Sequence, residues 1–113
     1  MKIYHNPRCS KSRQTLDLIK QKTKNYEIIE YLNKPLEFDE YKVILKKLKL
    51  KPINLVRIKE TIWKEKFKGK EISDNDIIKA LIDNPKLMVR PIVTTNKQAI
   101  RGIPPENVLD LFS

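Results

Sequence analysis

Residues 3–13 of this chain, Ile-Tyr-His-Asn-Pro-Arg-Cys-Ser-Lys-Ser-Arg, join a predicted strand to a predicted helix. The apolar run 1–4 predicts a short β-strand, and residues 10–20 predict an α-helix. The intervening His-Asn-Pro sequence is typical of a turn. The stretch also contains the only cysteine and the only histidine of the sequence, Cys9 and His5. The first strand-to-helix connection of the predicted fold therefore also contains the candidate catalytic residues.

The position of Cys9 predicts a reactive thiol. Unpaired backbone N–H groups and the helix dipole favour an anion at a helix N-terminus. Arg8, Lys11 and Arg13 add positive charge nearby. We therefore expect this thiol to ionise more readily than a free cysteine, whose pKa is about 8.5. A buried, inert cysteine is the alternative, but the polar and basic neighbours favour the thiolate.

Length and composition indicate one domain. The 113 residues suffice for a compact domain with its own core, and 34% of them are charged. No apolar run approaches the ~20 residues of a membrane span, and no signal-peptide pattern is present. A single cysteine cannot form an internal disulfide. We therefore expect a protein of the reducing cytoplasm without a membrane partner.

The net charge of +10 leaves several partners open. It is compatible with nucleic acid, with small anionic substrates, or with lysines that only face solvent. Neither an interleaved aromatic motif nor a helix-turn-helix pattern is visible, so we expect no nucleic-acid partner. One histidine and one cysteine are too few for a zinc site, so no metal and no bound cofactor are expected.

The order of elements predicts the fold class. Residues 26–31 predict a second strand, which completes a β-α-β unit with a right-handed crossover. Helices are expected over 37–49, 53–57 and 60–67, and after Ser73, whose side chain is expected to cap the helix that Asn84-Pro85 ends. Strands 92–95 and 98–101 predict a hairpin in which Asn96 adopts the left-handed conformation. A last short helix is expected over 105–112.

This order, β-α-β, a helical insertion and β-β-α, is that of a thioredoxin-like α/β fold. The expected sheet is mixed and four-stranded, with helices on its faces. We expect one domain over residues 1–113, with a helical insertion at about 34–87.

With this topology, the chain resembles the glutaredoxin-linked arsenate reductase family, which shares its fold with the Spx-type transcription regulators. The resemblance spans nearly the full length. Four motifs carry it: Tyr4-His5-Asn6-Pro7 with Cys9 and Ser12-Arg13; Leu55-Val56-Arg57 with Lys59-Glu60; Asn84-Pro85 with Arg90-Pro91-Ile92-Val93; and Gly102-Ile103-Pro104-Pro105-Glu106-Asn107-Val108-Leu109.

The resemblance implies a role for each matched residue. Cys9 would be the nucleophile that attacks arsenate or a similar oxyanion. His5 would help to keep it ionised, and Ser12 would hydrogen-bond the sulfur. Arg57 and Arg90 match two of the three arginines that bind the anion. Glutathione would act as co-substrate and glutaredoxin would regenerate the enzyme.

The third arginine of the family is displaced in this chain. The family usually reads Ile-Gly-Arg-Pro-Pro where this sequence reads Arg101-Gly102-Ile103-Pro-Pro. Side chains alternate along a strand, so we expect Arg101 and Ile103 to point to the same face. We therefore expect Arg101 to substitute in part for the missing ligand.

The residues themselves support some of these roles and leave alternatives for others. Arginine suits tetrahedral oxyanions by bidentate hydrogen bonding, but the spacing of Arg57 alone favours a surface residue on a basic helix. A purely structural turn histidine is the rival reading of His5. For Arg90, beside a proline at a strand entry, both readings are open. The resemblance to thioredoxin-like proteins also predicts a cis Arg90–Pro91 bond near the active cysteine.

Two other functions compete with arsenate reduction. An Spx-like regulator would bind RNA polymerase and sense oxidants, but such proteins typically carry Cys-x-x-Cys where this chain has Cys9 and Ser12. The other is a thiol reductase of the same family that lacks arsenate activity. Since a lone cysteine cannot resolve its own oxidised form, any redox cycle needs an external thiol.

Overall fold

The computed structural model describes residues 1–67 and 69–112, and the chain divides into two compact units. The sheet unit comprises Met1–Lys34 and Arg90–Ser113, and the helical unit comprises Pro35–Val89. The insertion expected at about 34–87 is thus the helical unit. Within the described residues, no helix is long and apolar enough to cross a membrane.

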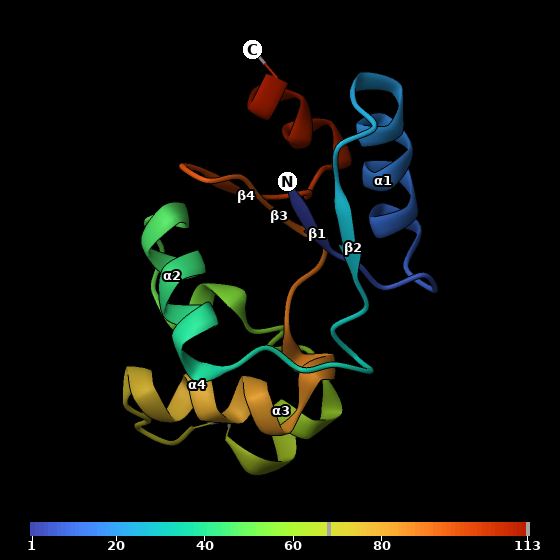
Figure 1. Cartoon of the computed structure of the whole chain (residues 1–113). Coiled ribbons are helices and arrows are strands. Elements are labelled where there is room, and N and C mark those ends of the chain that lie inside the picture. The colour runs from blue at the N-terminus through green and yellow to red at the C-terminus, as the bar shows by residue number, and fades with distance from the viewer. Residues whose placement is uncertain (68, 113) are drawn as a thin grey trace. The chain divides into compact units, whose positions relative to one another are not determined.

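A mixed sheet of four strands forms the centre of the sheet unit, counted over the described residues (Figure 1). The strands are β1 Lys2–Tyr4, β2 Glu27–Ile29, β3 Ile92–Thr94 and β4 Ala99–Arg101. They lie in the order β2-β1-β3-β4; β1 and β2 are parallel, and the other pairs are antiparallel. The predicted thioredoxin-like fold class is confirmed.

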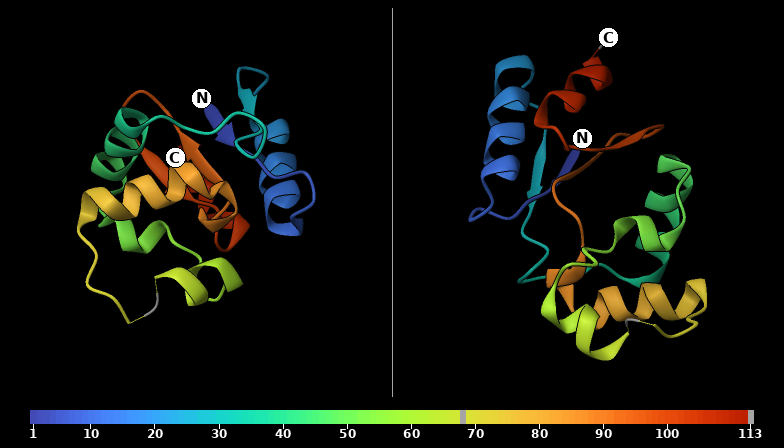
Figure 2. Two further views of the ribbon diagram at one scale, coloured as in Figure 1. Left: turned by 90° about the horizontal axis from the view of Figure 1, so that it is seen from below. Right: turned by 180° about the vertical axis from the view of Figure 1, so that it is seen from behind.

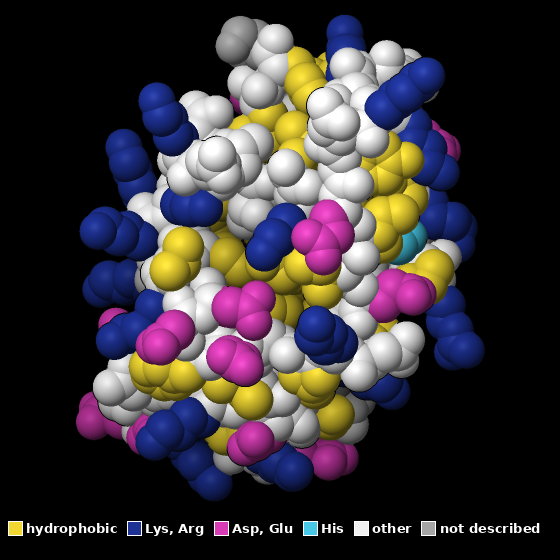
Figure 3. All heavy atoms as spheres, in the orientation of Figure 1, with side chains coloured by type: hydrophobic (Ala, Val, Ile, Leu, Met, Phe, Trp, Pro, Cys, Tyr) yellow, Lys and Arg dark blue, Asp and Glu magenta, His cyan; other side chains and the backbone are white. Residues whose placement is uncertain are grey.

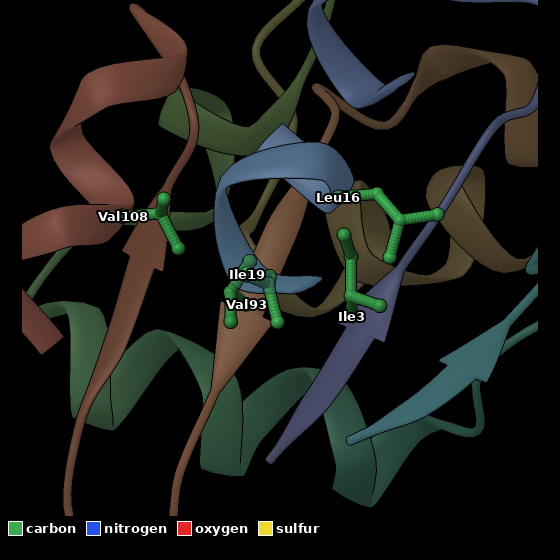
Figure 4. Close-up of a cluster of buried hydrophobic side chains, with 5 residues drawn as sticks. All are labelled: Ile3, Leu16, Ile19, Val93 and Val108. Carbon is green, nitrogen blue, oxygen red and sulfur yellow. The ribbon is translucent and has the colours of Figure 1, made fainter. Parts of the chain in front are cut away.

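Helix α1 (Ser10–Lys22) and the 3₁₀ helix η3 (Pro105–Phe112) pack against each other on one side of this sheet (Figures 1 and 2). Side chains of successive strand residues alternate between the two faces, so every second residue of β1 and β3 meets these helices. The resulting core cluster consists of Ile3, Leu16, Ile19, Val93 and Val108 (Figure 4). Full burial of such aliphatic side chains stabilises the unit by about 1.5–3 kcal/mol each.

The helical unit contains α2 (Phe38–Leu48), η1 (Pro52–Leu55), α3 (Thr61–Lys66), α4 (Asp74–Asp83) and η2 (Pro85–Leu87). The predicted cap of α4 is confirmed, because the Ser73 side chain accepts a hydrogen bond from the Asp76 N–H at 3.2 Å. At the start of α2, the Glu37 N–H donates a hydrogen bond to Glu40 Oε1 at 3.1 Å, which is the capping-box arrangement. An isolated antiparallel bridge pairs Val56, which follows η1, with Met88, which follows η2.

The predicted hairpin exists, but the expected conformation of Asn96 is wrong. Among the described residues other than glycine, only Lys49, the C-cap of α2, has a positive φ. The Thr95 side chain closes the turn instead: its Oγ1 accepts hydrogen bonds from the N–H groups of Lys97 and Gln98, at 3.4 and 3.0 Å. A hydroxyl that accepts hydrogen bonds from nearby backbone N–H groups thus replaces the left-handed residue expected at Asn96.

Candidate active site

Cys9 lies at the N-terminus of α1, as the sequence predicted, and is its N-cap residue. Its backbone is extended (φ −93°, ψ 124°), and its carbonyl accepts the first helical hydrogen bond, from the Arg13 N–H at 3.0 Å. Its own N–H donates to the Asn6 carbonyl at 3.0 Å, which closes the turn after β1. The first turn of α1 carries no acidic side chain, so no carboxylate offsets the positive end of the helix dipole. The side chain is partly exposed.

The surroundings of Cys9 favour the thiolate. Burial by itself raises the pKa of the Cys9 thiol. Three groups outweigh burial and bring the pKa of this thiol below its ordinary value: the Ser12 N–H, the Arg90 guanidinium through a hydrogen bond and its charge, and the Lys11 N–H. Hydrogen bonds and positive charge that favour the anionic form lower a pKa in this way.

The source of the positive charge differs in part from the sequence-based expectation. Of the three nearby basic residues, Lys11 acts through its backbone N–H, and neither Arg8 nor Arg13 is a source of the pKa shift. The Arg13 guanidinium instead donates to the Pro7 carbonyl at 3.0 Å. Arg90, at the entry to β3, supplies the cation. The resemblance assigned Arg90 to the anion and placed the Arg90–Pro91 bond near the active cysteine, but a direct contact of the guanidinium with the thiol was not predicted.

The rate of Cys9 alkylation should rise with pH with a midpoint below about 8.5, because the thiolate is the reacting species. In Arg90→Ala the midpoint should move up, since a hydrogen bond and a positive charge are both lost. Iodoacetamide labelling followed by mass spectrometry over pH 5–10 measures this. Arg8→Ala is the matched control, and a larger upward shift in Arg8→Ala than in Arg90→Ala would contradict the assignment.

His5 lies in the same turn and contacts Ser12. Its Nδ1 is 2.6 Å from Ser12 Oγ, and both side chains are buried. The Asn6 N–H also donates to Ser12 Oγ, at 3.0 Å. Burial lowers the pKa of His5; Glu30 opposes this effect, and the charges of Lys20 and Arg13 add to it.

A lowered pKa leaves the His5 imidazole neutral near pH 7, so it supplies no fixed positive charge to the thiolate. His5 and Asn6 both engage the hydroxyl of Ser12, and the Ser12 backbone N–H faces the sulfur. The structure thus gives Ser12 a contact with the thiol through its backbone, and gives His5 a contact with Ser12 that holds the turn.

The predicted cis Arg90–Pro91 bond is confirmed, and the Ile103–Pro104 bond, for which no prediction was made, is also cis. The two segments meet at Gly102, whose N–H donates to the Pro91 carbonyl at 2.9 Å. A Cβ atom on Gly102 would lie 2.6 Å from both Pro91 Cγ and Thr15 Oγ1. This close approach requires glycine at position 102.

The prediction that Arg101 and Ile103 lie on the same face of a strand is wrong. Strand β4 ends at Arg101, and Ile103 lies outside the sheet with its side chain 38% exposed. The alternation of a strand therefore does not relate the two side chains. Arg101 pairs with Ile92, which in turn pairs with Tyr4. Directly paired residues share a face, so Arg101 lies at the strand ends nearest the turn, on the face opposite to α1.

Arg57 belongs to the helical unit, where it precedes α3. Its guanidinium forms an ion pair with Glu60. Both residues line a pocket of about 390 Å³. Its role as an anion ligand stays a prediction.

No group of three or more His, Cys, Asp or Glu side chains that could hold a metal ion occurs within residues 1–67 and 69–112.

Comparison with known proteins identifies the family. The profile of the ArsC family matches residues 4–111. The chain is 44% identical over 113 residues to "Uncharacterized protein YfgD" of Escherichia coli K12, covering 98% of this chain and 95% of that protein. It is 40% identical over 110 residues to "Arsenate reductase" of Neisseria meningitidis, covering 96% and 94%. The solved structure "Arsenate reductase from Vibrio cholerae" superimposes with a TM-score of 0.91 at 40% identity and covers 97% of both chains. With its fold, its cysteine turn and these relatives, the chain belongs to the ArsC family.

Proposed function

We propose that this protein reduces arsenate, or a chemically similar oxyanion, to arsenite through the Cys9 thiolate. The observation that carries the proposal is the pair formed by Cys9 and Arg90: a nucleophile with a lowered pKa beside a guanidinium. The Nε atom of Arg90 is buried without a hydrogen-bond partner among the described residues. A bound oxyanion would satisfy this donor, because tetrahedral oxyanions accept hydrogen bonds from the planar guanidinium fork. Relatives that bear the name arsenate reductase support the same activity.

The chemistry balances with two external thiols. The Cys9 thiolate attacks arsenic(V), and one oxygen leaves as water after protonation. One external thiol then replaces a second oxygen on the arsenic, which leaves as water after protonation, and a second thiol attacks the sulfur of the first and breaks its bond to the arsenic. The two thiols form a disulfide and arsenic(V) is reduced to arsenic(III). Hydrolysis of the remaining Cys9 sulfur–arsenic bond releases arsenite and regenerates the thiolate. The net reaction consumes arsenate and two thiols and yields arsenite, one disulfide and water.

The external reductant in this proposal is glutathione together with glutaredoxin, in the cytoplasm. The lone cysteine supports an external thiol, because the chain has no second cysteine with which to form a resolving disulfide. Thioredoxin is the competing donor.

The direct test measures arsenite production from arsenate by the purified full chain. One arm contains glutathione and glutaredoxin, a second contains thioredoxin and its reductase, and a third contains no thiol. We expect catalytic turnover in the first arm only. Turnover confined to the thioredoxin arm would retain the activity and overturn the donor. No turnover in any arm would overturn arsenate reduction.

Arg101 remains a proposed ligand of the oxyanion, since it lies at the strand ends nearest the cysteine turn. Arg101→Ala should raise the KM for arsenate about tenfold, which is the lower end expected for a lost hydrogen bond to a charged group. Ile103→Arg, which restores the family pattern, should lower it. Steady-state kinetics of both variants measures these changes. If Arg101→Ala leaves KM and kcat unchanged, Arg101 is not a ligand.

A further inference from the structure

A pocket of about 380 Å³ lies beside the turn that precedes Cys9, entirely within the sheet unit. This volume lies within the ~300–1,000 Å³ range of ligand pockets. Its lining residues come from the turn after β1 and from the segment after β2: His5, Asn6, Pro7, Arg8, Glu30, Leu32 and Asn33. Asn6 connects the pocket to the nucleophile, because its carbonyl accepts the hydrogen bond of the Cys9 N–H.

The pocket presents charges of both signs. Arg8 supplies a guanidinium and Glu30 a carboxylate, and burial keeps His5 neutral by lowering its pKa. A carboxylate is notable in a protein of net charge +10, whose surface bears many Lys and Arg side chains (Figure 3). A plain anion such as arsenate would be repelled by Glu30. The carboxamides of Asn6 and Asn33 add hydrogen-bonding groups, and Pro7 and Leu32 add apolar surface.

We propose that this pocket binds the external thiol of the reaction, a small peptide-like thiol that carries a free α-ammonium and α-carboxylate, as glutathione does. The inference rests on the proposed function. The ammonium group contacts Glu30 and the carboxylate contacts Arg8, so the ligand is held by both charges. An extended tripeptide spans about 10 Å, and Arg8 and Cys9 are neighbours with Cα atoms about 3.8 Å apart. A thiol anchored in the pocket therefore has the length to reach past Arg8 to the arsenic on Cys9.

Direct binding tests the pocket without any arsenate chemistry. The probe is S-methylglutathione, which cannot react as a thiol, titrated calorimetrically into the native full chain. Glu30→Gln should weaken binding about fivefold, which corresponds to about 1 kcal/mol for an exposed ion pair. Glu27→Gln is the matched control: Glu27 is an exposed glutamate of the same strand region that does not line the pocket, and its replacement should leave binding unchanged.

A second ligand identifies the group that Glu30 recognises. N-acetyl-S-methylglutathione lacks the ammonium, so it should bind the native chain more weakly, and Glu30→Gln should not weaken it further. Equal affinity of both probes, equal affinity of native and Glu30→Gln chains for S-methylglutathione, or no binding would overturn the proposal.

Kinetics separates the pocket from the proposed function. In arsenate reduction, Glu30→Gln should raise the KM for glutathione and leave the rate with dithiothreitol, which has neither charge, unchanged. Equal effects with both thiols would overturn the pocket and retain the reductase. If no thiol supports arsenate reduction, the proposed function fails, and the binding measurements still decide what the pocket accepts.

Discussion

Arsenate reduction by Cys9→Ser is expected to fall to the rate measured without enzyme. A serine hydroxyl stays protonated at neutral pH, and none of the groups that favour the thiolate brings it near ionisation. Removal of a covalent nucleophile typically costs several orders of magnitude in kcat. The side chain changes by one atom at a partly exposed position, so the unfolding midpoint should stay within the range of a surface substitution. The measurements are arsenite production and thermal unfolding.

Moving the thiol to the neighbouring residue tests whether activity requires a cysteine at position 9 itself. In Cys9→Ser combined with Ser10→Cys, the thiol moves to the exposed first residue of α1. It loses the Arg90 guanidinium and the Ser12 and Lys11 N–H groups that surround position 9, so activity should not return. Ser10→Ala alone should show native kinetics. Substantial activity in either Cys9→Ser protein would exclude Cys9 as the nucleophile.

The sequence predicted those features of the fold that a few consecutive residues determine. Three features depend on a few consecutive residues, and each lies where the sequence placed it: the turn after β1, Cys9 at a helix N-terminus, and the Ser73 cap. The cis Arg90–Pro91 bond came from the resemblance, because no local rule distinguishes it from an ordinary trans proline.

Features that depend on partners elsewhere in the chain could not be read from the sequence. The β propensity of residues 26–31 predicts six strand residues, but β2 is only Glu27–Ile29, because it pairs with the three residues of β1 alone. Arg90 reaches Cys9 only because β3 pairs antiparallel with β1, so the start of β3 lies beside the end of β1. Only the resemblance placed the Arg90–Pro91 bond near the cysteine, because a charged residue near a strand entry gives no local sign of such a contact.

The pocket beside the turn was missed for the same reason. Its lining combines residues 5–8 with residues 30–33, which meet because β1 and β2 are parallel neighbours. Residues that follow two adjacent parallel strands lie at one edge of the sheet. That rule, applied to the predicted β-α-β unit, is the signal that could have drawn attention to Glu30.

Gly102→Ala should destabilise the protein by about 1–3 kcal/mol, the usual cost of forcing an extra carbon into a packed site. The new Cβ would lie 2.6 Å from Pro91 Cγ and from Thr15 Oγ1. Neither neighbour is a flexible side-chain end: Pro91 is a ring, and Thr15 is fully buried with its hydroxyl donating to the Lys11 carbonyl at 2.8 Å. Urea unfolding of native and variant chains measures the change.

A double-mutant cycle identifies the cause of that loss. Thr15→Ala removes one of the two clashing atoms, so the double variant Gly102→Ala/Thr15→Ala should be more stable than the sum of the single effects predicts. Gly69→Ala is the control, because Gly69 has φ +78° and a Cβ atom added there would meet no described atom within 4 Å. Its replacement should therefore cost only the left-handed backbone strain of about 1–2 kcal/mol and should be additive with Thr15→Ala.

The same variant tests whether this packing positions the guanidinium at the thiol. Because Pro91 follows Arg90, displacement of the proline in Gly102→Ala should raise the alkylation midpoint of Cys9, whereas Gly69→Ala should leave it unchanged. The measurement is the pH dependence of iodoacetamide labelling in the two variants and in the native chain. A midpoint that stays at the native value in Gly102→Ala would show that the contact with Pro91 supports stability alone.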